Sequence, residues 1–412
     1  MRFVNVFCVV LGLCIVMNTV VRVSAAEADD DGEQTIEPHR TGKFEIVQRG
    51  LPAKLYLETQ HEYGETLNAD HVRRVKRGEL EWLGDSNFEG GLTYKVYVPP
   101  SYEPDKPHGI YVHISPGNNG GVPGSYRDVL AKHRLIGIGA NNSGNQVGTS
   151  SRHAYAVHAA DMLRSAYSID EDRIYVGGFS GGGRVASQVM MMNADVFDGG
   201  VPMAGANPVV SMEIFPTNGP RFMYESKWKR IDRNLLRRAA KEGRFIFATC
   251  ENDSNLKNVT SVAEGYKKLG FQNVALFVEP DRGHAVLSGE WFAKAIAFLD
   301  APLREAAEQH YEQAVRMHDR GAWGNAIELF QKAAAHGGDA DWVPDAEARF
   351  RELRERYRKD VAAAEQAIEA VDTQALLKSL RTLRRAWGGY AREDVRDLTE
   401  RFREARRTQA NQ

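Results

Sequence analysis

The sequence has little cysteine and only one long apolar run. It contains 3 cysteines in 412 residues, and Cys8 and Cys14 both lie in the apolar run near the start. If this run is removed, Cys250 is alone, which excludes internal disulfides and a cysteine-rich metal site. No second apolar run approaches the length of about 20 residues that a membrane-crossing helix needs, which excludes a multi-span membrane protein.

Neither sign of charge is in excess. The chain has 53 Lys and Arg against 55 Asp and Glu, a formal net charge of −2. This balance argues against nucleic acid or an anionic membrane surface as the main partner. The G-x-x-x-x-G-K-[ST] phosphate loop, the H-E-x-x-H zinc motif and a dinucleotide fingerprint are all missing. We therefore expect no metal and no organic cofactor.

The N-terminus has the layout of a secretory signal peptide. Arg2 is followed by twelve apolar residues at 6–17, then by small residues ending at Ala25 and Ala26 and by an acidic run. We interpret residues 1–25 as a signal peptide and expect a secreted or periplasmic protein without stable membrane insertion after cleavage. An uncleaved N-terminal membrane anchor is the alternative, although twelve residues are shorter than the ~20 that span a bilayer.

The pattern of the rest divides the chain into three parts. Residues 26–77 are interpreted as an acidic linker and N-terminal segment, and residues 78–300 as an α/β domain. Strand-like runs occur at 79–83, 92–98, 109–114, 135–140, 173–177, 199–204, 244–249 and 274–278. Helical patterns occur at 125–133, 152–167, 182–192, 261–269 and 290–299. This alternation predicts a mostly parallel sheet with helices on both faces, and the early strands without helices predict an antiparallel start.

Residues 301–412 form a different region, rich in Ala, Glu, Arg and Leu. It contains 20 Lys or Arg and 20 Asp or Glu, the balance expected of solvated faces of amphipathic helices. Within 307–340, small and aromatic residues have the spacing of a tetratricopeptide helix pair: Ala314, Gly321, Ala326, Phe330 and Ala333. A single such repeat does not make an array. The region is therefore either a helical appendage that binds a protein partner or a small bundle packed on the α/β domain.

The sharpest motif lies where the strand at 173–177 runs into a helical pattern. The sequence Gly178-Phe179-Ser180-Gly181-Gly182 fits G-x-S-x-G. Glycines allow a tight strand-to-helix turn that exposes a serine hydroxyl at the start of a helix. A glycine-rich turn of a nucleotide-binding protein is the alternative. Such a turn follows the first strand of its sheet, however, and this motif follows a later strand. Ser180 is therefore the predicted nucleophile.

An acid and a base follow Ser180 in the chain order that this architecture requires. Asp253 comes after the strand-like run at 244–249, and His284 comes after the run at 274–278. Because carboxyl ends of parallel strands meet at one sheet edge, we expect His284 to act as the base and Asp253 to orient it. Glu251 stays open as an alternative acid. His113, His153 and His158 are interpreted as structural.

Two further groups of residues complete the predicted site. An oxyanion hole needs two N–H donors. We expect one from Gly181, directly after the nucleophile, and the other from Gly117 or Asn118 in the glycine-rich loop at 115–121. The segment at 205–243 is longer than a simple crossover and contains Phe215, Phe222, Tyr224 and Trp228. It is interpreted either as a small substrate cap or as ordinary packing.

With these motifs the segment at 78–300 resembles the α/β-hydrolase superfamily. The sequence at 92–102 followed by a strand and a glycine loop is similar to the secreted esterase branch, which includes poly(3-hydroxybutyrate) depolymerase-like enzymes. This branch usually has His-Gly where this chain has Ser115-Pro116. The resemblance implies a secreted serine esterase acting on a small-molecule or polymeric ester. An extracellular serine peptidase and a non-catalytic scaffold that binds partners through its C-terminal helices are the alternatives.

Overall fold

A computed structural model describes residues 39–48, 92–226, 228, 231–338 and 340–410. The expected signal peptide at 1–25 and the strand-like run at 79–83 lie outside these residues. Among the helices of the described residues, none combines the length and the apolar character needed to cross a bilayer.

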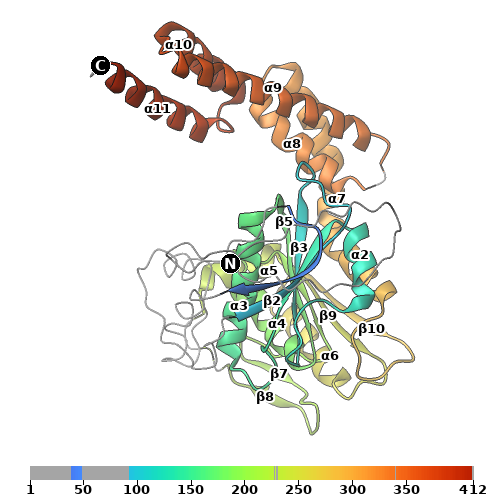
Figure 1. The fold of residues 1–412 in the computed structure, drawn as a ribbon. Coiled ribbons are helices and arrows are strands. Elements are labelled where there is room, and N and C mark those ends of the chain that lie inside the picture. Colours follow the sequence, from blue (N-terminus) through green and yellow to red (C-terminus); the bar gives the residue numbers. More distant parts are fainter. Residues whose placement is uncertain (1–38, 49–91, 227, 229–230, 339, 411–412) are drawn as a thin grey trace, which may run out of the picture.

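One eight-stranded sheet organises the larger part of the described chain (Figure 1). Its spatial order is β1 (Gly42–Gln48), β2 (Leu92–Val98), β4 (Leu135–Ala140), β3 (His108–Ile114), β5 (Ile169–Phe179), β6 (Gly199–Met203), β9 (Arg244–Cys250) and β10 (Asn273–Glu279). The pairs β1–β2 and β2–β4 are antiparallel, and all the others are parallel. The expected mostly parallel sheet is confirmed. Its antiparallel start includes β1, a strand inside the segment at 26–77 that the sequence analysis treated as a linker.

Helices cover both faces of this sheet. One face packs against α3 (Thr149–Ala166), α4 (Gly181–Met192), α5 (Arg233–Glu242) and α6 (Leu256–Lys268), through a large apolar core. The other face packs against α2 (Arg127–Lys132) and the start of α7 (Gly289–Asp319). Every residue of β3, β4 and β9 is buried, as expected for strands covered on both sides. This arrangement, with the order above, is the α/β-hydrolase fold.

The C-terminal region is entirely helical and has its own core. It contains the second half of α7 with α8 (Trp323–His336), α9 (Val343–Glu369), α10 (Thr373–Thr382), a π-helical turn (Leu383–Trp387) and α11 (Arg392–Ala410). The expected boundary at residue 300 falls inside α7, which continues from the sheet domain into the helical region without a linker. Ala314, Ala326, Phe330 and Ala333 are buried in this second core, and the tetratricopeptide-like character of the helix pair stays a prediction.

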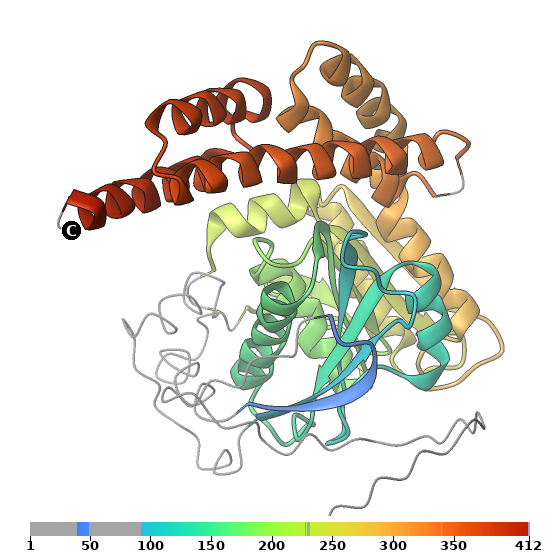
Figure 2. The same ribbon diagram turned by 45° about the horizontal axis from the view of Figure 1, so that its top comes forward.

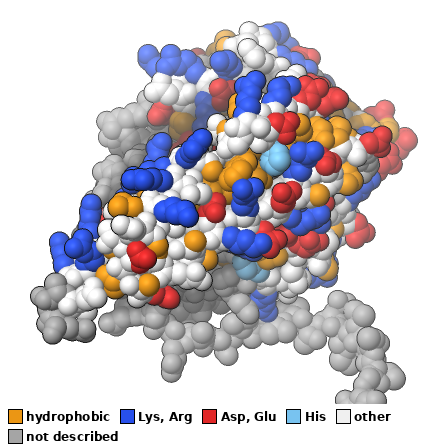
Figure 3. Space-filling model, turned by 90° about the horizontal axis from the view of Figure 1, so that it is seen from above, with side chains coloured by type: hydrophobic (Ala, Val, Ile, Leu, Met, Phe, Trp, Pro, Cys, Tyr) orange, Lys and Arg blue, Asp and Glu red, His pale blue; other side chains and the backbone are white. Residues whose placement is uncertain are grey.

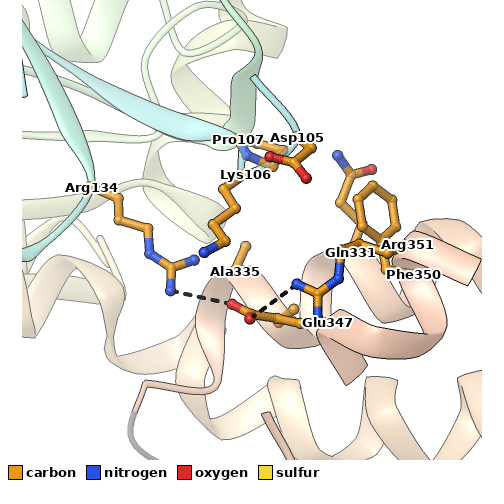
Figure 4. Close-up of a pocket in the computed structure, with 10 residues that line it drawn as sticks. Asp105, Lys106, Pro107, Arg134, Gln331, Ala335, Glu347, Phe350 and Arg351 are labelled. Carbon is orange, nitrogen blue, oxygen red and sulfur yellow. Dashed lines mark ion pairs between the residues drawn. The ribbon is translucent and has the colours of Figure 1, made fainter. Parts of the chain in front are cut away.

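The helical region contacts the edge of the sheet where the parallel strands begin. In α8, His336 Nε2 lies 2.7 Å from Oδ2 of Asp170, and Lys332 pairs with Asp172; both acids lie in the first half of β5. Figure 4 shows a pocket at this junction, where Glu347 of α9 pairs with Arg134 at 3.7 Å. Ser180 follows the other end of β5, so the helical region and the G-x-S-x-G turn lie at opposite edges of the sheet (Figures 1 and 2).

A buried ion pair joins α7 to β5 just before the helix leaves the sheet domain. Asp300 accepts hydrogen bonds from Arg173 Nε and Nη2 at 2.9 and 2.8 Å and from the Tyr175 hydroxyl at 2.8 Å. Burial by itself would raise the pKa of Asp300. The Arg173 guanidinium and the hydrogen bonds from His133, Arg173 and Tyr175 outweigh that effect and hold the pKa well below 3.8.

Asp300→Asn should therefore lower the free energy of unfolding by about 3–5 kcal/mol, because it leaves the Arg173 charge buried without a counter-ion. Because the folded pKa of Asp300 is depressed, its stabilisation is complete above the unfolded pKa of about 3.9 and is lost as the pH falls below it. Urea unfolding at several pH values measures both effects. Asp172→Asn, which disrupts an exposed pair with Lys332, is the control and should cost less than about 1 kcal/mol. An equal cost for the two variants would contradict the prediction.

Candidate active site

The nucleophile turn is as tight as its glycines predict. Ser180 lies between β5 and α4 with φ 54° and ψ −116°, a left-handed conformation that non-glycine residues rarely adopt. A Cβ on Gly178 would lie 2.6 Å from the carbonyl carbon of Gly182, and a Cβ on Gly182 would lie 1.9 Å from the Ile114 oxygen. Glycine at these positions therefore lets strand and helix come close enough to present the Ser180 hydroxyl.

Three side chains from three loops form one hydrogen-bonded series. Ser180 Oγ lies 3.0 Å from His284 Nε2, and His284 Nδ1 lies 3.0 Å from Asp253 Oδ1. Asp253 follows β9 and His284 follows β10, so all three residues lie at the carboxyl edge of the parallel part of the sheet. The structure thus brings together the nucleophile, base and acid that the sequence analysis selected, which we call the triad.

The surroundings of the acid distinguish Asp253 from Glu251. The Asp253 side chain is fully buried, and its Oδ1 also accepts a hydrogen bond of 2.8 Å from the backbone N–H of Asn255. This bond holds the carboxylate in place to accept from His284. Glu251 is exposed, and its Oε2 accepts from the backbone N–H of Asp281 instead. The geometry therefore assigns the orienting role to Asp253.

Arg184 joins the nucleophile helix to the loops around the acid. Its guanidinium donates to the side-chain oxygens of Asn255 at 2.9 Å, Thr217 at 2.9 Å and Asn207 at 3.1 Å. Burial lowers the pKa of Arg184, and the nearby Asp253 carboxylate acts in the opposite direction. The side chain therefore brings a positive charge close to the triad acid while it fixes the loop that carries Asn255. No sequence motif indicated this residue.

The loop after β3 supplies fewer backbone donors than expected. Pro116 has no N–H, and the N–H of Gly117 donates to Ser115 Oγ at 3.1 Å. Of the two residues named for the second donor, Asn118 is the one whose N–H is left for it. Gly181 begins α4, where the first N–H groups of a helix have no partner within the helix.

A buried arginine forms hydrogen bonds to the backbone of this loop and of the nucleophile turn. Arg152 of α3 is 5% exposed and donates to the carbonyl oxygens of Ser115 at 2.8 Å and Gly181 at 3.4 Å. Burial lowers its pKa to about 10, so it stays charged at neutral pH. None of the described residues gives it a carboxylate partner within salt-bridge distance. Its charge therefore adds a positive field at the loop where an oxyanion would form.

The segment at 205–243 places the expected cap residues in different surroundings. It forms a two-stranded hairpin of β7 (Met212–Ile214) and β8 (Phe222–Tyr224), followed by α5. Phe222 is 45% exposed, whereas the Trp228 ring stacks on the buried His153 imidazole. Phe215 lies under the Arg221 guanidinium, and Tyr224 is partly buried against the large apolar core. Of these four side chains, Phe222 is thus the one that faces solvent most.

The three histidines that the sequence analysis interpreted as structural, His113, His153 and His158, are all buried. Burial lowers the pKa of His113 to about 4 and that of His153 to about 3, so both are neutral at pH 7. His158 Nδ1 bonds to the buried Tyr94 hydroxyl at 3.0 Å. Within the described part of the chain, no three His, Cys, Asp or Glu side chains gather as a metal site requires.

The sheet order, the strained serine and the hydrogen-bonded triad define a serine hydrolase of the α/β-hydrolase fold. In agreement, residues 154–306, a little over a third of the chain, match the sequence profile of the prolyl oligopeptidase family, which spans Ser180, Asp253 and His284. No curated protein sequence matches the chain.

Several solved structures are similar over 52% of the chain. They include a protein assigned as a dipeptidyl aminopeptidase IV from Bacteroides ovatus (16% identity, TM-score 0.35), of whose length this chain spans only 34%. Esterase 2 from Thermogutta terrifontis (18% identity, TM-score 0.36) is covered over 88% of its length. The fluorophosphonate-binding serine hydrolase FphF from Staphylococcus aureus (13% identity, TM-score 0.38) is covered over 94%. At TM-scores this low, these likenesses add nothing to the argument from the sheet and the site.

Proposed function

We propose that the protein is a secreted carboxylic-ester hydrolase that acts through an acyl-enzyme on Ser180. The observation that carries this proposal is the continuous series of hydrogen bonds from Ser180 through His284 to Asp253. Lone serine hydroxyls are poor nucleophiles, and an adjacent base that is itself oriented by an acid is what activates them.

The geometry supports a two-stage reaction. Ser180 Oγ attacks the ester carbonyl while its proton passes to His284 Nε2, and Asp253 stabilises the imidazolium that results. Collapse of the tetrahedral intermediate expels the alcohol, which takes the proton from His284. Water then enters, gives a proton to His284 and attacks the acyl-enzyme, and the carboxylic acid leaves as Ser180 recovers its proton.

The open triad favours an ester whose alcohol or acyl part is large. The His284 side chain is 39% exposed, and the described part of the segment at 205–243 adds a short hairpin and one helix rather than a separate lid domain. The exposed Phe222 and Met223 of β8 offer apolar surface at the end of this hairpin. We therefore propose a bulky or polymeric ester, in keeping with the resemblance to poly(3-hydroxybutyrate) depolymerase-like enzymes.

A serine peptidase is the second candidate, and the match of residues 154–306 to the prolyl oligopeptidase profile favours it. The same triad can cleave an amide, so the triad alone does not choose between the two substrate classes. A non-catalytic scaffold is less favoured, because His284 lies within hydrogen-bond distance of both Ser180 and Asp253.

Export and a partner for the C-terminal helices are further parts of the proposal. The apolar run at 6–17 supports secretion. The helix pair α7–α8 has the small-residue spacing of a tetratricopeptide repeat, which supports a protein partner for this region. Figure 3 looks down on the molecule from the side of the helical region, where acidic and basic side chains lie together on the right and basic ones predominate on the left. The equal numbers of basic and acidic residues in 301–412, 20 of each, give no support to a nucleic-acid partner.

A comparison of ester and amide substrates tests the proposed function. The purified full chain should react with a fluorophosphonate probe and hydrolyse p-nitrophenyl butyrate much faster than the matched p-nitroanilides, including a Gly-Pro p-nitroanilide. Ser180→Ala serves as the blank. Faster cleavage of the anilides would favour the peptidase instead. A folded wild-type protein that neither reacts with the probe nor cleaves either class would contradict both candidates.

A further inference from the structure

A second loop at the carboxyl edge of the sheet lies against the nucleophile turn. This loop, residues 141–148, follows β4 and is tied to the loop at 115–121 by backbone hydrogen bonds. The N–H of Asn145 donates to the Pro116 oxygen at 2.9 Å, and the N–H of Asn142 donates to the Asn118 oxygen at 2.8 Å. The Asn118 side chain also accepts from Gln146. These bonds fix the position of Asn145 relative to the loop beside the nucleophile.

The Asn145 carboxamide occupies the space that a side chain at position 181 would fill. A Cβ on Gly181 would lie 1.9 Å from Asn145 Oδ1 and 2.8 Å from Asn145 Nδ2. Glycine at position 181 is therefore what admits the amide group to the start of α4, directly beside the nucleophile. The G-x-S-x-G pattern leaves this position open, and the glycine here leaves room for the Asn145 carboxamide in the conformation observed.

The same amide group is free to bind a substrate. Asn145 is exposed, and its carboxamide makes no hydrogen bond to any other residue that the structure describes. The neighbouring backbone has few donors, because Pro116 has no N–H and the N–H of Gly117 is taken by Ser115 Oγ, which leaves the N–H of Asn118. The positive charge of Arg152 lies against the carbonyl groups of Ser115 and Gly181. An anion formed here thus has a positive field but few backbone donors.

We propose that Asn145 is a further catalytic residue, whose side-chain N–H donates to the oxyanion together with the backbone N–H of Gly181. This inference rests on the proposed acyl transfer at Ser180. As the bond from Ser180 Oγ to the carbonyl carbon forms, the π electron pair of the carbonyl moves onto its oxygen and the serine proton moves to His284. The Asn145 N–H stabilises this new negative charge, and the interaction weakens when the carbonyl re-forms.

The test compares Asn145→Ala and the isosteric Asn145→Asp with wild-type protein. Loss of one side-chain oxyanion donor typically reduces kcat by about 10²–10³-fold. Both variants should therefore lose about 10²-fold or more in kcat for p-nitrophenyl butyrate, with KM within about threefold of wild type. The rate constant for inactivation by the fluorophosphonate should fall in parallel. Asn145→Asp should be the poorer of the two, because a carboxylate there repels the oxyanion.

Asn119→Ala is the matched control. Asn119 is an exposed asparagine on the neighbouring loop, but its carboxamide accepts from Lys95 rather than reaching α4. This variant should keep kcat within about threefold of wild type, and all variants should keep the thermal midpoint of wild type. An Asn145→Asp protein with wild-type kcat would overturn the proposal. So would a loss confined to KM, because that indicates uniform binding of substrate and transition state.

The fluorophosphonate probe allows the role of Asn145 to be tested independently of the proposed substrate class. A fluorophosphonate reacts with the activated serine of esterases and peptidases alike, so the Asn145 comparison can be made with either substrate. If the wild-type protein cleaves amides faster than esters, the proposed function fails and the ratio between Asn145 variants and wild type still decides the role of Asn145. If wild-type protein reacts with neither the probe nor any substrate, both proposals are overturned.

Discussion

Ser180→Ala is expected to reduce kcat by about 10⁶-fold and to abolish labelling by the fluorophosphonate. The reason is that His284 and Asp253 act only through the serine oxygen, so removing the nucleophile removes the acyl-enzyme route as a whole. A residual rate of about 10³–10⁴-fold over the uncatalysed reaction should persist where the oxyanion donors still bind the transition state. Steady-state hydrolysis of p-nitrophenyl butyrate at high enzyme concentration, together with gel detection of the probe, measures both effects.

The folded state of this variant should be easy to verify. Alanine has no hydroxyl to bond to His284, but the φ of 54° at position 180 is equally strained for serine and alanine. The thermal midpoint should therefore stay close to that of wild type. Retention of more than about a hundredth of wild-type kcat in a pure preparation would contradict the assignment of Ser180 as the nucleophile.

Asp253→Ala is expected to reduce kcat by about 10⁴-fold, the second largest effect. Without the carboxylate, His284 loses the hydrogen bond that fixes its ring and the charge that stabilises its protonated form. Labelling by the fluorophosphonate should slow but not vanish, because the nucleophile Ser180 and the base His284 are both still present. Stopped-time labelling and steady-state hydrolysis together give the measurement.

Glu251→Ala is the control for this prediction. Glu251 lies two positions from Asp253 on the same loop, but it accepts from the backbone of Asp281 and does not contact His284. Its removal should change kcat by no more than a few-fold. If Glu251→Ala loses as much activity as Asp253→Ala, the geometry assigns the wrong acid.

Sequence reasoning selected the three residues that the structure places in one hydrogen-bonded series, because each of them is marked by a local pattern. Ser180 lies in a glycine turn between a strand and a helix, and Asp253 and His284 each follow a strand-like run. Parallel strands bring such positions to one edge whatever the distance along the chain. The fold class followed from the same alternation of strands and helices.

The parts that sequence reasoning did not reach depend on contacts between distant loops. Arg152, Asn145 and Arg184 act through hydrogen bonds or close contacts that no periodicity records. The N–H of Gly117 was counted as a donor because nothing in the sequence indicates that Ser115 Oγ takes it. The strand β1 was missed because its pairing with β2 spans the long segment at 49–91.

The expected boundary at residue 300 lies within a single helix, α7. The composition changes there, from strand-rich to Ala- and Arg-rich sequence. A helix can nevertheless continue through such a change when each of its halves has an apolar face to bury. The first half of α7 buries Phe292, Ile296 and Leu299 against the sheet, and the second half buries Ala314 in the helical core. Asp300 then fixes the middle of the helix to Arg173.

The helical region and the reactive serine lie at opposite ends of the strand β5. Asp170, near the start of this strand, pairs with α8, and Ser180 follows its last residue about 30 Å further on, at roughly 3.3 Å per residue. If the C-terminal helices are tethered to a larger assembly, the reactive serine points outward, away from the tether. The enzyme could then work across a solid or polymeric surface while its anchorage stays clear of the substrate.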